Sequence, residues 1–145
     1  MDLSILYPKV QEFIQDQLGV SIAKLALQKN PFPEIDWLTI LNQIEAKTKS
    51  REKLPTWFST IAIIYPSKLS IEQTSSERTA EYKSSLIAGN SLIDLTGGFG
   101  VDDYYFAKKI NKIVLIMVSA STIFAQENCT PLIERACAMA APAPP

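Results

Sequence analysis

The stretch Ser91–Asp103, which reads SLIDLTGGFGVDD, constrains this chain more than any other part of it. A short apolar run ends in the acid Asp94, a cluster of glycines follows, and two more acids, Asp102 and Asp103, come directly after it. In open α/β proteins a parallel strand turns into a helix in this way beneath a bound ligand, and glycines let the backbone approach that ligand closely. The stretch therefore predicts a strand, a ligand-binding turn and a helix.

The residues on both sides of this turn predict a β-α-β unit. A short buried strand is expected over Leu92–Leu95, a helix over Val101–Lys109 and a second strand over Lys112–Val118. This order is typical of an α/β sheet, with Asp94 at the carboxyl end of the first strand, where such sheets place their ligands.

A further helix is predicted just before this unit. Thr74-Ser75-Ser76-Glu77 has the hydroxyl-to-acid spacing of a capping box, in which Thr74 begins the helix and Glu77 reaches back to it. The helix is expected to run to about Ala88, where Gly89-Asn90 ends it.

The first third of the chain has apolar residues at helical spacing. It predicts helices over Val10–Leu18 and Ser21–Leu27, and a third that Asp36 caps and that carries Trp37, Ile40, Leu41 and Ile44 on one face. Core packing accounts for all three amphipathic faces.

The third helix is expected to end at Lys53-Leu54-Pro55, followed by the aromatic pair Trp57 and Phe58, for which burial is favoured over stacking on a base. Ile61–Tyr65 is interpreted as a short strand or an extended segment. The end of the helix holds the one basic concentration in the chain, Lys47, Lys49, Arg51 and Lys53. A solvated helix end is the default interpretation, and a surface that contacts phosphate is the alternative.

Composition excludes several classes of function. The chain of 145 residues has a net charge of −1, so its overall charge does not favour a polyanionic partner. It contains no His, which excludes catalytic triads and removes the commonest metal ligand. Cys129 and Cys137 fit neither a zinc site nor a disulfide framework, and we expect unpaired thiols in a reducing cytoplasm. We expect no bound metal and no membrane span.

Three classes of ligand compete for the glycine turn. A P-loop is excluded, because Val101-Asp102-Asp103 stands where Gly-Lys-Ser/Thr is required. A dinucleotide fingerprint is a weak alternative, since its third glycine is replaced by Asp103 and acids at the start of a helix repel a pyrophosphate. The third class is a ligand without phosphates that has an amino acid end and a nucleoside, and nearby acids suit its cationic groups. S-adenosylmethionine is such a ligand.

The turn resembles the first motif of class I S-adenosylmethionine-dependent methyltransferases. The residues that carry this resemblance are Asp94, the small residue Thr96, and the glycines Gly98 and Gly100. The form Asp94-x-Thr96-x-Gly98-x-Gly100-x-Asp102 also resembles a subset of bacterial ribosomal RNA methyltransferases. The resemblance implies a Rossmann-like sheet.

Earlier segments extend the resemblance to residues 1 to about 114. They are similar to the N-terminal part of bacterial methyltransferases that have a THUMP-like domain, and they are Lys24–Lys29, Pro31–Pro33, Lys53–Trp57 and Ser70–Glu77. The resemblance implies S-adenosylmethionine as the cofactor and RNA as the methyl acceptor. The cofactor-binding residues that it implies are Gln73, Thr74, Ser75, Ser76, Asp94, Thr96, Gly97, Gly98, Phe99, Gly100 and Asp102; it identifies no catalytic residue.

The chain departs from the family pattern after about residue 114. A class I methyltransferase is expected to have an acid after its second strand to bind the ribose hydroxyls, but Met117-Val118-Ser119-Ala120 contains none. The end of the chain is of low complexity, and no further strand and helix units follow. A frameshift or a premature end at this point would produce such a change, and this is our hypothesis for residues 115–145.

These patterns together predict an α/β chain in three parts. Residues 1–72 form a helical N-terminal region, residues 73–118 the truncated start of a Rossmann-like class I methyltransferase sheet, and residues 119–145 an atypical tail. Because two strands can hardly form a stable cofactor pocket, we expect weak or no methyltransferase activity and no micromolar binding of S-adenosylmethionine. The alternative is a non-enzymatic helical module that contacts a partner or RNA through Trp37, Trp57 and Lys47–Lys53.

Overall fold

The chain forms two compact units, residues 1–73 and 74–145, which are described separately below. The computed structural model describes residues 3–95, 98–119 and 122–125, and for residues 116–119 and 122–125 it describes the backbone alone.

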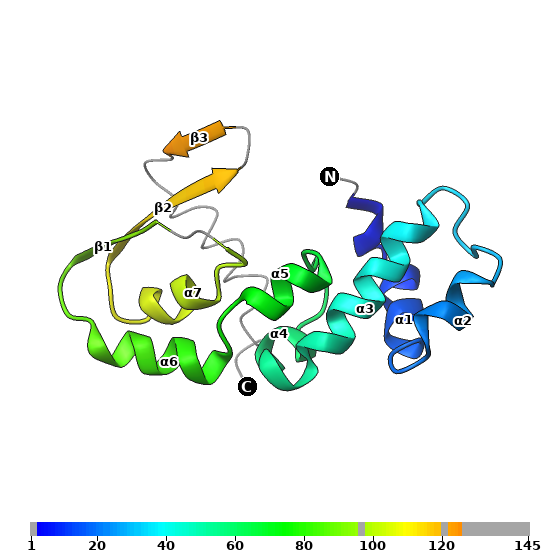
Figure 1. The fold of residues 1–145 in the computed structure, drawn as a ribbon, viewed down its shortest axis with the longest axis horizontal. Helices are drawn as coiled ribbons and strands as arrows, with labels where there is room; N and C mark the ends of the chain where they lie inside the picture. The colour runs from blue at the N-terminus through cyan, green and yellow to red at the C-terminus, as the bar shows by residue number, and fades with distance from the viewer. Residues whose placement is uncertain (1–2, 96–97, 120–121, 126–145) are drawn as a thin grey trace. The chain divides into compact units, whose positions relative to one another are not determined.

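The N-terminal unit is helical in its described part (Figure 1). Its elements are the 3₁₀ helix η1 (Leu3–Leu6) and the α-helices α1 (Pro8–Asp16), α2 (Ile22–Ala26), α3 (Trp37–Lys53), α4 (Pro55–Ser59) and α5 (Lys68–Gln73). The three helices predicted from apolar spacing correspond to α1, α2 and α3. The short helices α4 and α5 were not predicted, because neither is long enough to show a helical period.

The core of this unit lies between η1, α1, α2 and α3. The predicted apolar faces are confirmed, since Val10 and Ile14 of α1 and Ile40 and Ile44 of α3 are at most 1% exposed. The ring of Phe13 lies 5.5 Å from that of Phe32 and 6.1 Å from that of Trp37, measured between centroids. These contacts bury the amphipathic faces against one another.

Helix α3 begins and ends where its sequence predicts. The Asp36 carboxylate accepts a hydrogen bond from the backbone N–H of Thr39 at 2.8 Å, which satisfies one of the free donors of the first turn. The helix ends at Lys53, before Pro55. Trp57 is buried, as the sequence predicts.

The basic end of α3 is less solvated than predicted. Lys47 is buried with 6% exposure, so it does not belong to a basic surface. Lys49 pairs with Glu72 at 3.7 Å, Lys53 donates to the backbone carbonyl of Glu72 at 2.7 Å, and the Arg51 guanidinium lies over the ring of Phe58 at 5.3 Å. Lys49, Arg51 and Lys53 thus each contact another residue of the same unit.

Of the two interpretations of Ile61–Tyr65, a short strand or an extended segment, the strand does not form. Its last residue is instead held by a side chain of α3: Gln43 donates from Nε2 to the Tyr65 carbonyl at 2.7 Å, and the Tyr65 N–H donates to Gln43 Oε1 at 2.8 Å. One buried amide side chain therefore does what a neighbouring strand would do for this backbone, so the segment needs no sheet.

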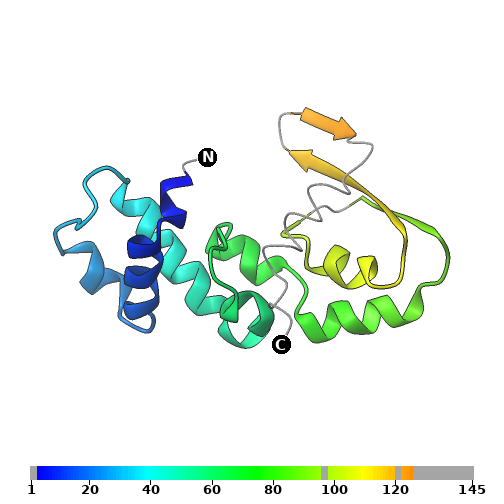
Figure 2. The same ribbon diagram turned by 180° about the vertical axis from the view of Figure 1, so that it is seen from behind.

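The C-terminal unit contains the predicted β-α-β arrangement. Its described elements are α6 (Glu77–Leu86), β1 (Ser91–Asp94), α7 (Val101–Ala107), β2 (Lys112–Ser119) and β3 (Thr122–Ala125). Strands β1 and β2 are parallel, with Ser91 opposite Lys112 and Asp94 opposite Leu115. Helices α6 and α7 lie on the same side of these two strands in both Figure 1 and Figure 2.

Strand β3 and the end of α6 differ from the predictions. Strand β3 was not predicted; it pairs antiparallel with β2, with Ile116 opposite Ala125, in a segment assigned to the tail. Helix α6 ends at Leu86 rather than near Ala88, because Ile87 is already extended. Gly89 has a positive φ of 134° but lies beyond the helix end.

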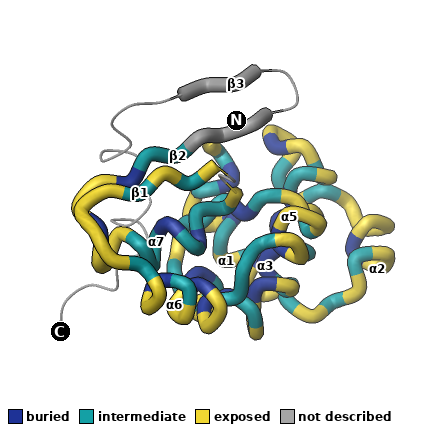
Figure 3. The backbone as a smooth tube through the Cα atoms, turned by 60° about the vertical axis from the view of Figure 1, so that its left-hand side comes forward, coloured by how far each residue is buried: buried dark blue, intermediate teal, exposed yellow. Residues whose placement is uncertain are grey.

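One face of β1 is open to solvent, so the prediction of a buried strand over Leu92–Leu95 is wrong. Exposed and half-buried residues alternate along the strand (Figure 3), and Ile93 and Leu95 are more than 60% exposed. Parallel sheets are usually covered by helices on both faces. In the described residues helices cover one face only, which is consistent with part of an α/β methyltransferase fold.

Replacing Gln43 tests its role as a substitute strand partner. Gln43→Met leaves the N–H and C=O of Tyr65 buried without partners, and we expect the free energy of unfolding to fall by about 2–4 kcal/mol in urea titrations. The neighbouring Asn42 is exposed, and the control Asn42→Met should change it by less than about 0.5 kcal/mol. Equal stability of the two variants would contradict this role.

Candidate functional site

The glycine turn connects β1 to α7 as the sequence predicts. Asp94 is the last residue of β1, and Gly100 is the N-cap of α7 with a left-handed φ of 79°, which favours glycine at this position. Gly98 does not have such a φ, and a Cβ built on it meets nothing within 4 Å. The backbone at Gly98 therefore borders open space next to the end of the strand.

Two acids meet beneath this turn. Asp103, in the first turn of α7, is 2% exposed, and its carboxyl group is hydrogen-bonded to that of Asp94. Burial, the charges of Asp94 and Asp102 and this hydrogen bond together raise the pKa of Asp103 to about 7. A hydrogen bond between two carboxyl groups needs a proton on one of them, and with a pKa of about 7 Asp103 is about half protonated at neutral pH.

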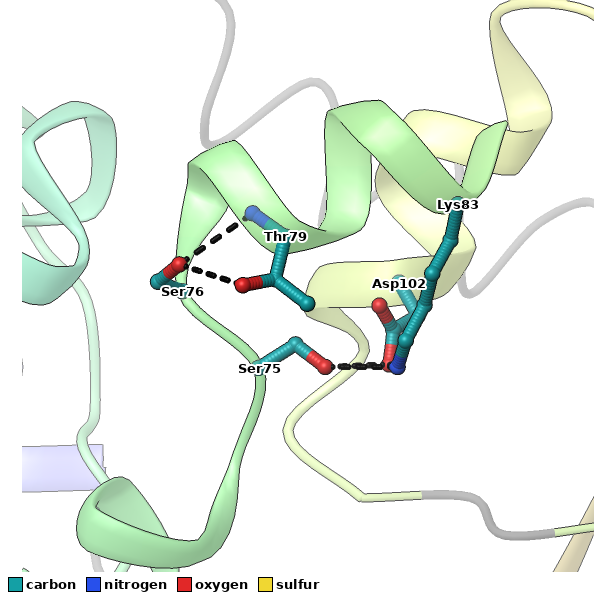
Figure 4. Close-up of polar contacts among 5 residues, drawn as sticks. All are labelled: Ser75, Ser76, Thr79, Lys83 and Asp102. Carbon is teal, nitrogen blue, oxygen red and sulfur yellow. Dashed lines mark hydrogen bonds and ion pairs between the residues drawn. The ribbon is translucent and has the colours of Figure 1, made fainter. Parts of the chain in front are cut away.

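The negative charge of the third acid, Asp102, is compensated by the positive charge of Lys83. Asp102 Oδ2 accepts a hydrogen bond from Ser75 Oγ at 2.8 Å and one from Lys83 Nζ at 2.9 Å, and Lys83 Nζ also lies 2.8 Å from Ser75 Oγ (Figure 4). Ser75 precedes α6 and Lys83 lies in its last turn. The contact therefore joins α7 to both ends of α6.

The predicted capping box is shifted by two residues. Ser76, not Thr74, is the N-cap of α6: its Oγ accepts from the Thr79 N–H at 3.1 Å (Figure 4). Glu77 is already the first helical residue, and its carboxylate accepts from the Tyr105 hydroxyl at 3.0 Å. Burial and this neighbouring acid raise the pKa of Tyr105 to about 12. The sequence motif identified the start of the helix to within two residues but not the capping residue.

The site residues predicted from the sequence fall into three groups. Ser75 contacts Asp102, Asp94 contacts Asp103, and Phe99, Gly98 and Gly100 lie in the loop between them. Gln73 ends α5 in the other unit, and Thr74 begins this one. Thr96 and Gly97 lie outside the described residues, as do Cys129 and Cys137.

The site residues predicted from the sequence did not include Asp103 and Lys83, which contact Asp94 and Asp102. The sequence predicted Asp103 as the second acid in the first turn of a helix, but it does not show which of two adjacent acids is buried. Lys83 lies two helical turns after Ser76, so its spacing places it on the same face of α6. Only the packing of α6 against α7, through the buried Glu77, Ala80 and Ser84, brings it to Asp102.

Among the described residues, no group of three or more His, Cys, Asp or Glu is arranged to hold a metal ion, and Asp94, Asp102 and Asp103 do not form such a group either. Of the helices in the described ranges, none is both long and apolar enough to cross a membrane.

Comparison with known proteins gives one informative similarity. No protein-family profile matches the chain, and no curated protein matches it significantly. It is similar to a crystal structure described as that of a putative methyltransferase from Porphyromonas gingivalis W83, with 27% identity, a TM-score of 0.65 and 94% of this chain covered. The chain spans 32% of the length of that protein. Sequence and fold therefore both resemble part of a protein described as a methyltransferase.

The buried acid pair predicts a specific pH dependence. The pKa of Asp103 is about 7 in the folded chain against an ordinary value of 3.8, so the folded state binds this proton more tightly than the unfolded chain does. The contribution of this group to the free energy of unfolding therefore falls as the pH rises from about 4 to about 7 and is constant above.

Asp103→Asn, which keeps the shape of the protonated acid, removes this loss. Its stability relative to the wild type should increase by about 2 kcal/mol between pH 5 and pH 8, measured by urea unfolding. The control Asp102→Asn weakens the half-exposed pair with Lys83 and should cost up to about 1 kcal/mol, with no such gain at high pH. A stability difference between Asp103→Asn and the wild type that does not change with pH would refute the shared proton.

Proposed function

We propose that this chain contains the S-adenosylmethionine-binding loop of a class I methyltransferase. The observation that carries the proposal is the open space at Gly98, in the turn that follows Asp94 at the carboxyl end of β1. A glycine without positive φ and without a close neighbour is not required there by the fold. It is accounted for if a ligand lies against its backbone.

The charge of the loop supports the choice of ligand. Lys83 compensates Asp102, and a pKa of about 7 leaves the buried Asp103 about half protonated at neutral pH, so the negative charge of the cluster is smaller than that of three free acids. A phosphate ligand would be repelled by this charge. S-adenosylmethionine has a sulfonium and an ammonium group and one carboxylate, so its net charge is opposite to that of the cluster.

The methyltransferase assignment is supported independently by the similarity to the Porphyromonas gingivalis protein. RNA as the methyl acceptor and the kinship with THUMP-like methyltransferases are supported by the sequence resemblance alone. Because the described sheet contains one parallel strand pair, the chain binds the cofactor weakly in this proposal and transfers methyl groups slowly or not at all.

The alternative of a helical interaction or RNA-contacting module has less support. It requires Trp57 and Lys47 on a contact surface, and both are only 6% exposed. Lys49 and Arg51 are exposed, yet Lys49 is paired with Glu72 and Arg51 lies over Phe58. Charge reversal of these two residues would change RNA binding under this alternative only.

Titration of the ¹⁵N-labelled chain with S-adenosylmethionine tests the proposal by NMR. We expect amide shifts in Ser91–Asp103 with a dissociation constant of about 1 mM, and weaker binding of ATP because of its phosphates. Gly98→Ala should weaken binding about tenfold without changing the melting temperature, because its Cβ occupies space that is open in the free protein.

Gly100→Ala is the matched control for stability. Its left-handed φ makes any side chain strained, so this variant should lose about 1 kcal/mol of folding free energy whether or not a ligand is present. Equal affinity of Gly98→Ala and the wild type, or tighter binding of ATP than of S-adenosylmethionine, would reject the proposal.

A further inference from the structure

The N-terminal unit contains a pocket that the proposed function does not use. Its volume is about 570 Å³, within the range of sites for small organic ligands. Helix α1, the residues just before it, the end of α4 and the segment after α4 provide its walls, and Lys47 of α3 also lines it. All of these residues belong to the same compact unit.

Lys47 is the unusual residue of this pocket. It is 6% exposed, and none of the hydrogen bonds and ion pairs found among the described residues involves its ammonium group, which keeps some contact with solvent. Lys49, Lys53, Lys68 and Lys83 each have a polar partner at 3.7 Å or less. Burial lowers the pKa of Lys47, as expected for a cation that is largely removed from water. Such a group is destabilising unless something in the pocket neutralises it.

The other lining residues define what could neutralise it. The wall is largely apolar, with Leu6, Pro8, Phe58 and Ile61, and it includes the hydroxyl-bearing Ser59 and Thr60. Glu12 also lines the pocket, and its negative charge disfavours a ligand with two or more negative charges. Ala62, another wall residue, has a φ of 62°, a strained conformation that occurs preferentially at ligand sites.

We propose that this pocket binds a small organic monocarboxylate, whose carboxylate pairs with the ammonium group of Lys47 while its apolar body lies against Leu6, Pro8 and Phe58. A charge-assisted bond from an otherwise uncompensated cation gives the ligand its orientation. The apolar walls give affinity in proportion to the ligand surface that they bury. This site is independent of the glycine turn and of the reaction proposed for it.

NMR titration of the full chain with benzoate tests this site. We expect saturable shifts of the amides of Leu6 and of residues 58–62, and about tenfold weaker binding of benzamide, which has the same shape without the charge. Inorganic phosphate should bind more weakly than benzoate, since it lacks an apolar body and has more negative charge at neutral pH.

The variant Lys47→Met keeps an apolar stem and removes the ammonium group. We expect its affinity for benzoate to fall about tenfold and its melting temperature to be unchanged or higher, because a desolvated charge is lost. Lys49→Met, two residues along the same helix at an exposed position, is the matched control and should bind benzoate as the wild type does. Equal affinity of Lys47→Met and the wild type, or of benzamide and benzoate, would overturn the proposal.

A measurement on the wild type keeps the test valid if Lys47→Met fails to fold. Titration of ¹³C-methylated lysines should show the pKa of Lys47 rising when benzoate is added, since a bound anion favours the charged amine. An unchanged pKa of Lys47 at a benzoate concentration that saturates the amide shifts would equally overturn the proposal.

Discussion

The contact between Asp102 and Lys83 connects the parts of the C-terminal unit on which the candidate site depends. Asp102 lies in the first turn of α7, directly after the glycine loop, and accepts hydrogen bonds from Lys83 and Ser75 at the two ends of α6. The loop is thereby fixed at its helical end, while its other end is fixed by the pairing of β1 with β2.

Charge compensation changes what the loop can bind. The sequence shows three acids around the turn, which would repel most ligands that themselves carry a negative group. In the folded chain Asp102 is paired with Lys83, and the buried Asp103, with a pKa of about 7, is about half protonated at neutral pH. The remaining negative charge is compatible with a ligand that has two cationic groups and one carboxylate, and it is unfavourable for a pyrophosphate.

The N-terminal unit shows the opposite electrostatic situation. The buried N–H and C=O of Tyr65 are satisfied by Gln43, but Lys47 lines a pocket whose walls are mainly apolar. A largely buried cation without an ion pair lowers the stability of the folded chain, and an anion that binds beside it reduces this loss. The unit thus combines a well-packed core around α1 and α3 with a pocket that contains a largely buried lysine.

Local patterns predicted most of the fold. Apolar spacing predicted α1, α2 and α3, and the side chain of Asp36 predicted the start of α3. The run Ser91–Asp94 with its glycines predicted the β-α-β unit, because these features depend on residues close in sequence. Helices α4 and α5, strand β3 and the true cap Ser76 were not predicted. Short elements have too few residues to show a period, and the three consecutive hydroxyl residues Thr74–Ser76 offer equivalent caps until the helix is packed.

For the site, the sequence by itself determined the glycine turn, its position after a strand and the presence of acids around it. It also determined that no His is available and that no acid follows the second strand in Met117–Ala120. Only the tertiary structure decided which acid is buried, which is paired with Lys83, and which basic residue of α3 is removed from solvent. These properties depend on burial and on contacts between residues 19 to 27 positions apart, and side-chain charge responds to such an environment only once the chain has folded.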